Sequence, residues 1–413
     1  MKLSMNPVRP CTIRPPFLLH NQLFSPNSTQ KITPKRHRTS ITILSLKSVQ
    51  APRKGLCQKW MDYQGISNWE GLLDPLDVTL REEIIRYGNF VEAAYKSYDF
   101  DPSSLTYARC RHSKGKLLPR ATGYQVSRHL RATSGIRVPR WTELAPGWMS
   151  TQSSWIGYVA VCNDKNEIAR LGRRDVVVAL RGTATCLEWL ENLRANLTPL
   201  HENDSCGPMV ESGFLSLYTS STGTSQSLQS SIREEISRIL KVYGDEPLNI
   251  TISGHSLGAA LAILAAYDIK QTFRDSPLVT VMSFGGPRVG NSSFRQHLEK
   301  NGAKVLRIVN SEDPVTRVPG FVIDNDNEER IDSYKKSVSS WFHKLVKDTQ
   351  WVYADVGCEL RLSSRDSPYH NGINIAACHD LKTYLNLVSS NCPIRATAQK
   401  IIAKRMKQTT VAV

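Results

Sequence analysis

The sequence predicts an α/β protein with a mostly parallel central sheet that helices cover on both faces. Short apolar runs of strand length alternate with longer segments of helical periodicity, as in α/β domains. The run at 175–180 (DVVVAL) is apolar nearly throughout and β-branched, which is typical of a strand buried on both faces. With 413 residues, 40% hydrophobic and 22% charged, the chain can build a large core, and a collagen-like or wholly disordered chain is excluded.

The first half of the chain is expected to hold one helix and then two strands. The segment 79–98 carries apolar and aromatic residues at helical spacing. Glycine, proline and basic residues break any period over 99–147, so we expect an irregular cap there. Strands are predicted at 154–162 and 175–180.

The second half continues the alternation of helices and strands. Helices are predicted from apolar residues at helical spacing, at 228–243, 257–272, 334–347 and 379–388. Strands are predicted from short apolar runs, at 248–253, 279–284, 304–309 and 351–362.

The N-terminal stretch differs from the rest of the chain in charge. No Asp or Glu precedes Asp62, whereas 11 Lys and Arg side chains do. Without them the net charge falls from +16 to +5, with 42 basic against 37 acidic side chains, so composition gives no support for nucleic-acid binding. The stretch is rich in Ser, Thr and Pro and lacks a long apolar block, which predicts a transit peptide and a chloroplast (plastid) location; a disordered basic arm is the alternative.

The domain boundaries follow from these changes in composition. We expect a transit peptide and disordered basic arm at 1–57, a helical and irregular cap segment at 58–150, a catalytic domain at 151–392 and a basic tail at 393–413. Nine scattered cysteines without a C-x-x-C pair indicate neither a disulfide framework nor a zinc site. No run reaches the roughly 18 apolar residues of a membrane span, so we expect a soluble or peripheral protein.

The motif Gly254-His-Ser-Leu-Gly258 lies between a predicted strand and a helix of small residues. Glycines two residues on either side of Ser256 let the chain reverse sharply there. Such a turn holds the serine hydroxyl above the sheet edge, at the positive end of the following helix. The sequence therefore predicts that Ser256 is a nucleophile.

A serine nucleophile needs a base, and the base needs an orienting carboxylate. Asp313 directly follows the strand at 304–309, and its alternative role is a turn cap before Pro314. Among the histidines downstream, His379 is favoured, with His370 and His343 as alternatives. Five rival carboxylates lie downstream but none follows an apolar strand so closely: Asp324, Asp326, Asp332, Asp355 and Asp366.

An oxyanion hole requires two N–H donors. Leu257, the residue after the serine, supplies one in a turn of this kind. Thr183 is the candidate for the other, because Arg181-Gly182-Thr183 follows the strand at 175–180; the alternative is an ordinary strand end.

Taken together, these motifs resemble the class 3 (fungal-type) lipases. The matching segments occur in the family's order, at 178–183, 254–262, 284–290, 313–319 and at His379 followed by Tyr384. Three further segments resemble more narrowly the plant plastid phospholipase A1 class I enzymes, at 60–75, 170–175 and 183–189.

This resemblance implies a cofactor-independent α/β-hydrolase. It implies hydrolysis of the sn-1 ester of phosphatidylcholine or plastid galactolipids, with Ser256 as nucleophile, Asp313 as orienting acid and His379 as base. Thr183 and Leu257 would form the oxyanion hole, and phospholipid and galactolipid would be the partners. A neutral-lipid lipase or carboxylesterase, or an inactive lipid-binding protein of the same fold, are the alternatives.

The chain departs from the family pattern at one place, and two of its segments are candidates for membrane contact. Many relatives have Val-His-x-Gly-Phe where this chain has Val210-Glu-Ser-Gly-Phe214. The segments 184–200 and 334–347 interleave apolar and charged residues, as expected for peripheral contact with a plastid membrane surface or for helices packed on the sheet.

Overall fold

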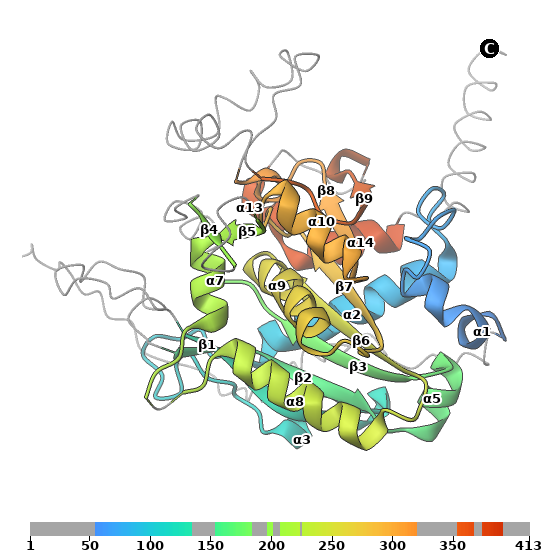
Figure 1. Ribbon diagram of the computed structural model, residues 1–413, viewed down its shortest axis with the longest axis horizontal. Coiled ribbons are helices and arrows are strands. Elements are labelled where there is room, and N and C mark those ends of the chain that lie inside the picture. Colours follow the sequence, from blue (N-terminus) through green and yellow to red (C-terminus); the bar gives the residue numbers. More distant parts are fainter. Residues whose placement is uncertain are drawn as a thin grey trace, which may run out of the picture. The chain divides into compact units, whose positions relative to one another are not determined.

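A seven-stranded sheet forms the centre of the protein. The computed structural model describes residues 54–133, 153–183, 196–200, 207–223, 225–319, 353–366 and 374–390. In the sheet the strands are ordered β1-β2-β3-β6-β7-β8-β9, and pairing is parallel from β3 to β9, while β1 and β2 are antiparallel additions at one edge (Figure 1). The strand bounds are β1 Tyr124–Thr133, β2 Ser153–Cys162, β3 Arg174–Leu180, β6 Leu248–His255, β7 Leu278–Phe284, β8 Lys304–Asn310 and β9 Cys358–Leu362. A separate small sheet pairs β4 (Leu197–Pro199) with β5 (Met209–Glu211).

Helices cover both faces of this sheet. On one face lie α7 (Ser212–Thr219), α8 (Leu228–Tyr243), α9 (Leu257–Thr272) and α10 (Ser292–Lys300). On the other lie α1 (Lys54–Tyr63), α2 (Val78–Ser97) and α14 (Leu381–Ser390). The remaining helical segments are short, namely α3 (Lys114–Leu117), α5 (Lys165–Leu171), α13 (Ile375–His379) and the 3-10 turns η1 (Arg120–Thr122), η2 (Pro314–Arg317) and η4 (Ser364–Asp366).

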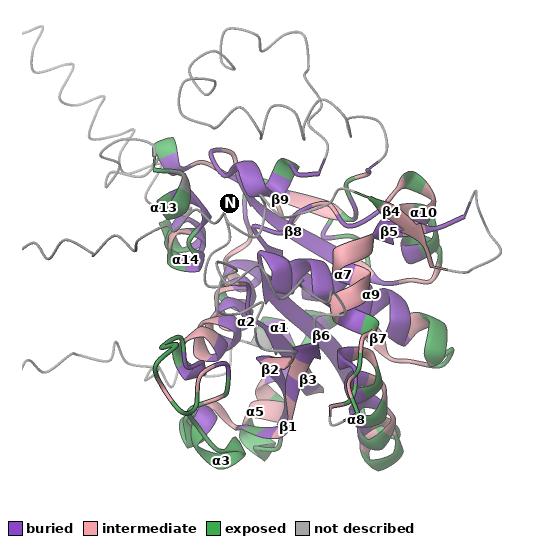
Figure 2. Cartoon of the chain, turned by 90° about the vertical axis from the view of Figure 1, so that its left-hand side faces the viewer, coloured by how far each residue is buried: buried purple, intermediate pink, exposed green. Residues whose placement is uncertain are grey.

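The strand side chains divide the core into two layers. Along β3, Val176 and Val178 enter the cluster under α8 and α9, whereas Val177 and Ala179 enter the cluster under α2. This alternation is the period of two that a strand imposes, and burial on both faces makes its sequence continuously apolar. Figure 2 accordingly shows the strands as largely buried.

Helix α2 packs the N-terminal segment of the described chain, residues 54–97, against the sheet. Asp77 caps it by accepting hydrogen bonds from the N–H groups of Thr79 and Leu80, at 2.8 and 2.9 Å. Its buried face carries Leu80, Ile84, Tyr87, Val91 and Ala94 at spacings of three and four, the spacing of one helix face. The N-terminal segment therefore packs directly against the sheet.

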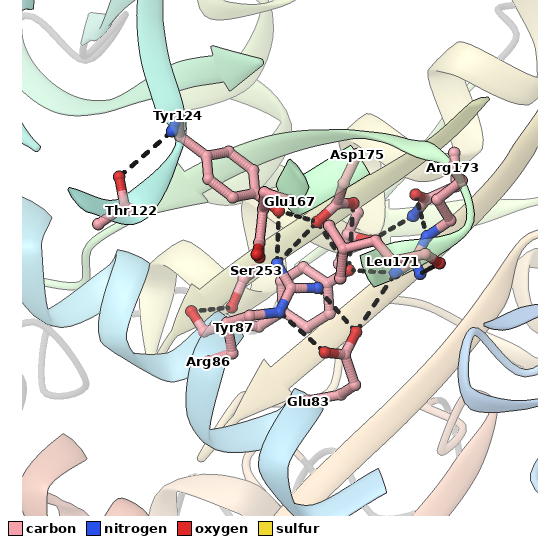
Figure 3. A network of polar contacts seen from close by, with 12 residues as sticks. Glu83, Arg86, Tyr87, Thr122, Tyr124, Glu167, Leu171, Arg173, Asp175 and Ser253 are labelled. Carbon is pink, nitrogen blue, oxygen red and sulfur yellow. Dashed lines mark hydrogen bonds and ion pairs between the residues drawn. The ribbon is translucent and has the colours of Figure 1, made fainter. Parts of the chain in front are cut away.

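A buried cluster of charges lies where α2 crosses the start of β3 (Figure 3). Arg86 contacts Asp175 at 2.8 Å and Glu83 at 2.7 Å, and the Arg173 guanidinium lies 3.3 Å from Glu83. Burial alone raises the pKa of Glu83, but the two guanidinium groups outweigh it and bring that pKa down to about 2. Every charge in the cluster is thus paired, as buried charges must be to be tolerated.

Most of the predicted elements are confirmed, and some are wrong in position. The helices predicted at 79–98, 228–243 and 257–272, and the strands from 154–162 to 304–309, correspond to α2, α8, α9, β2, β3, β6, β7 and β8. The strand predicted at 351–362 begins only at Cys358, and the helix predicted at 379–388 is α14, which begins at Leu381. The helix predicted at 334–347 and residues 184–195 lie outside the described residues.

The predicted irregular segment at 99–147 contains a strand that sequence reasoning missed. Tyr124–Thr133 forms β1 and pairs with β2. The register shifts between Val126 and Arg128 and again between Leu130 and Arg131. These two irregularities interrupt the alternation of apolar and polar residues that identifies a strand in sequence.

Candidate active site

The turn at Ser256 has the geometry that the G-x-S-x-G spacing predicts. Ser256 lies between β6 and α9 with φ 57° and ψ −126°, a backbone conformation that non-glycine residues rarely adopt. A Cβ atom on Gly254 would lie 2.2 Å from the carbonyl oxygen of Gly258, so the turn closes only with a glycine there. Ser256 is therefore held at the carboxyl end of β6 and at the N-terminus of a 16-residue helix.

The structure brings Asp313 and His379 into direct contact. The Nδ1 atom of His379 lies 2.7 Å from Oδ2 of Asp313, and both side chains are buried. Asp313 follows β8 and also caps η2, since its Oδ1 accepts from the Val315 N–H at 2.9 Å. Asp313 is therefore a turn cap, the role given above as the alternative, and at the same time it contacts His379 with its other carboxylate oxygen.

Tyr384 adds a contact to this pair that sequence reasoning did not assign. Its hydroxyl donates to Oδ2 of Asp313 at 2.6 Å and lies 3.2 Å from the backbone N–H of Asn310, which donates to it. Asp313 therefore accepts three hydrogen bonds, from Tyr384, His379 and Val315. Such bonds fix the orientation of a carboxylate.

The loop after β3 lies beside the serine turn. A Cβ atom added to Gly182 would lie 2.9 Å from Cβ of Ser256, and one added to Gly258 would lie 2.4 Å from the Leu180 carbonyl oxygen. Thr183 follows in this loop; its Oγ1 atom is buried, and none of the described residues hydrogen-bonds with it. Leu257 is the first residue of α9, where an N–H group has no acceptor within the helix.

His255, the residue before Ser256, links this loop to His379. Its Nδ1 atom lies 2.7 Å from the Tyr95 hydroxyl, and its Nε2 atom lies 2.7 Å from the backbone carbonyl oxygen of His379. The two imidazole rings lie 4.8 Å apart between centroids. The N–H of Gly182 donates to the Tyr95 hydroxyl at 2.8 Å.

The departure at Val210-Glu-Ser-Gly-Phe214 has a structural role of its own. Glu211 caps α7, because its carboxylate accepts from the N–H groups of Gly213 and Phe214 at 2.9 and 2.7 Å. Its side chain is buried, and burial raises the pKa of Glu211 to about 7 despite these two hydrogen bonds. Sequence gave no signal for this role beyond the departure itself.

The remaining sequence candidates are placed as follows. The sequence predicted that His379 opens the final helix, and this is wrong. His379 ends the preceding short helix α13, because Asp380 adopts an extended conformation between the two helices. His370 and His343 lie outside the described residues. Among the side chains that the structure describes, no cluster of three or more His, Cys, Asp or Glu could hold a metal ion. No helix in the described part of the chain is both long and apolar enough to span a bilayer.

The chain matches a known family model and several characterised plant proteins. Residues 177–323 match the model described as lipase (class 3). The Arabidopsis thaliana protein named phospholipase A(1) DAD1, chloroplastic, is 60% identical over 363 residues, which cover 84% of this chain and 80% of that protein. The protein of the same plant named galactolipase DONGLE, chloroplastic, is 41% identical over 356 residues, covering 81% and 70%.

A solved structure is also similar. The lipase of Rhizopus microsporus var. chinensis has a TM-score of 0.43 at 18% identity, over 76% of this chain and 86% of that one. The relation to the Arabidopsis proteins is much nearer and extends over most of both chains. This chain belongs to the class 3 lipase family, in the branch of the plant proteins named phospholipase A1.

Proposed function

We propose that the protein is an acyl hydrolase that releases free fatty acid from the sn-1 ester of phosphatidylcholine, plastid galactolipids or both. The observation that carries the proposal is the buried Asp313–His379 pair, 2.7 Å apart, at the sheet edge where Ser256 occupies its strained turn. A serine, a histidine and a carboxylate in this arrangement provide a nucleophile, a base and the group that orients the base.

In the proposed mechanism Ser256 attacks the ester carbonyl. His379 removes the serine proton with the ring nitrogen that does not face Asp313 and gives it to the leaving alcohol as the ester C–O bond breaks, which leaves the acyl group on Ser256. Water, deprotonated by His379, then attacks this acyl-enzyme, and His379 returns the proton to Ser256 as the fatty acid leaves. Asp313 holds the tautomer that presents this nitrogen and stabilises the imidazolium that forms. Tyr384 supports the step by keeping Asp313 in place through its 2.6 Å hydrogen bond.

The oxyanion formed by this attack is assigned to two donors. Leu257 offers a backbone N–H that no helical carbonyl accepts, and the N-terminus of α9 adds its favourable field for negative charge. Thr183 offers its backbone N–H and its buried hydroxyl. The close approach of Gly182 to Ser256 supports this assignment, because it holds the Thr183 loop beside the serine.

The substrate and the location are inferred from the family branch. The Arabidopsis relative that is 60% identical is named a phospholipase, and the one that is 41% identical is named a galactolipase. We place this enzyme in the chloroplast, where released fatty acid can enter jasmonate synthesis and where the enzyme meets the membrane peripherally. No step requires a cofactor.

Hydrolysis of defined vesicles by the purified protein tests the proposal. The assay offers phosphatidylcholine, galactolipid and triacylglycerol, each with different acyl chains at the sn-1 and sn-2 positions, and identifies the fatty acid released. Ser256→Ala should lower turnover by up to about a millionfold, as loss of the nucleophile does in comparable triads. Ser253→Ala, which removes a buried hydroxyl from the same strand, is the matched control and should stay active.

The alternatives give different results. Preference for triacylglycerol would indicate a neutral-lipid lipase. Failure of wild-type protein to react with a fluorophosphonate would indicate a lipid-binding protein without catalysis. More than a few per cent of wild-type activity in Ser256→Ala would contradict the mechanism.

A further inference from the structure

We propose that Tyr95 and His255 are positioning residues that hold the oxyanion loop and the catalytic base in fixed relation on either side of Ser256. The inference rests on the proposed function, since it concerns how that chemistry is kept in register. Its basis is a continuous series of three short hydrogen bonds. They connect the backbone at Gly182 with the backbone at His379.

The direction of each hydrogen bond follows from the donors and acceptors available. The His379 carbonyl oxygen can only accept, so Nε2 of His255 carries the proton in the 2.7 Å bond between them. Burial, and then the neighbouring His379 ring, hold the pKa of His255 well below its usual value, so the ring is neutral. Its Nδ1 atom is then an acceptor, and the Tyr95 hydroxyl donates to it at 2.7 Å.

The series ends at the oxyanion loop. Having donated its proton to His255, the Tyr95 oxygen accepts the N–H of Gly182 at 2.8 Å. This bond fixes the Arg181–Gly182 peptide plane, one peptide before the Gly182–Thr183 plane whose N–H we assign as an oxyanion donor. Only glycine fits at position 182, because a Cβ atom there would lie 2.6 Å from the Tyr95 oxygen.

The other end of the series acts on the backbone that carries the base. Two consecutive carbonyl groups are held there: that of His379 by His255, and that of Cys378 by the Asn310 side chain at 2.9 Å. Asn310 ends β8, and Asp313 follows three residues later. The backbone of His379 is therefore held from two strands: by Asn310 of β8, which Asp313 follows, and by His255 of β6, which Ser256 follows.

Tyr95 itself comes from α2, outside the segment 177–323 that matches the family model. Its side chain reaches the site from the face of the sheet that the N-terminal segment covers. The N-terminal segment therefore contributes directly to the geometry of the site and does more than cover the core.

Replacement of Tyr95 by Phe tests the inference on a short soluble ester. The variant should lose about 10- to 100-fold in kcat, with KM nearly unchanged. Removing an oxyanion donor outright costs about 100- to 1,000-fold, and the loss of a positioning residue should not exceed the lower of these values. Tyr158→Phe is the matched control: it removes a buried tyrosine hydroxyl that donates to the Phe90 carbonyl oxygen at 2.8 Å, also on α2. Its kcat should stay near wild type, and the two variants should have similar melting temperatures.

A pair of substitutions at His255 separates positioning from packing. A Gln amide nitrogen occupies nearly the place of Nε2 and can donate to the His379 carbonyl, whereas an Asn amide is too short to reach it. His255→Gln should therefore keep more of the wild-type kcat than His255→Asn, although both introduce a buried amide. In protein labelled with ¹⁵N at histidine, the His255 ring should be protonated at Nε2 in both the wild type and Tyr95→Phe, because the His379 carbonyl accepts that proton. The Nδ1 signal should shift in Tyr95→Phe, because that nitrogen loses the Tyr95 donor.

The outcomes are distinct. Equal kcat values for Tyr95→Phe and Tyr158→Phe, or higher activity in His255→Asn than in His255→Gln, would overturn the inference, as would an unchanged His255 Nδ1 signal in Tyr95→Phe. A wild-type protein that hydrolyses no ester would refute the proposed function instead. In that case the histidine spectrum still decides whether Tyr95 holds the ring.

Discussion

Replacing Glu211 by Gln should remove a pH dependence of folding stability. The Glu211 carboxyl is buried and titrates at about 7 in the folded protein, against an ordinary value of 4.5. Between these values the unfolded chain has lost the proton and the folded chain still holds it. Stability therefore falls as pH rises through this window, the opposite of what a salt-bridged carboxylate does.

The magnitude follows from the two pKa values. Linkage gives a fall in the free energy of unfolding of about 2.5 kcal/mol between pH 5 and pH 8 from this group alone. The Gln side chain has one oxygen in place of two to cap the N–H groups of Gly213 and Phe214, which costs about 1 kcal/mol at any pH. The variant should thus be less stable than wild type at pH 5 and more stable at pH 8.

Denaturant unfolding at intervals between pH 5 and pH 8 measures the effect. Glu235→Gln is the matched control, because Glu235, in α8, is also a buried carboxylate. Burial raises its pKa, but hydrogen bonds led by the one from Arg238 outweigh this and keep that pKa below the usual value. Its removal should leave the slope between pH 5 and pH 8 unchanged. Parallel curves for wild type and Glu211→Gln would refute the assignment of a raised pKa.

Three further predictions concern the base, the location and the membrane. His379→Ala should lose as much activity as the serine variant in the same ester assay, while His370→Ala should stay active; the reverse order would move the base to His370. A fluorescent fusion lacking residues 1–50 should remain in the cytosol, and its import into plastids would contradict a transit peptide. Replacing Trp341 and Phe342 by Ala should weaken the free energy of vesicle binding, measured by co-sedimentation, by up to roughly 1.5–3 kcal/mol per side chain, while soluble-ester turnover survives. Equal loss of both, with a lower melting temperature, would place these residues in the core.

The elements that the sequence predicted well are those whose surroundings impose one simple period. Helix α8 was predicted with its observed bounds because one face is buried and the other meets solvent. Strand β3 was predicted because burial on both faces makes it continuously apolar. Strand β1 lies at the edge of the sheet and contains two register shifts. Its sequence is therefore neither continuously apolar nor regularly alternating, and no strand was predicted there.

The same distinction applies to the site. The turn at Ser256 was predicted because its backbone demands glycines at fixed spacing, and spacing is visible in sequence. Tyr95 appeared only as one apolar position on a helix face, since nothing local to α2 indicates that its hydroxyl meets His255, 160 residues away. Tyr384 was visible only through its place in a family motif. Contacts of this kind depend on how distant elements pack, which local patterns do not report.

Helix α2 connects two different kinds of polar contact. Near its middle, Arg86 and Tyr87 hold Asp175 at the beginning of β3, within the charged cluster of Figure 3. Two turns later, Tyr95 meets Gly182 just beyond the end of the same strand. Tyr87 and Tyr95 are eight residues apart, about 12 Å along a helix axis. Their partners are Asp175, the second residue of β3, and Gly182, which lies two residues beyond its end. The ion cluster thus sets the position of α2 along β3, and the neutral tyrosine is held at the catalytic edge. The charges of this cluster lie at the start of β3, at the opposite end of the strand from Gly182, and there they fix the helix.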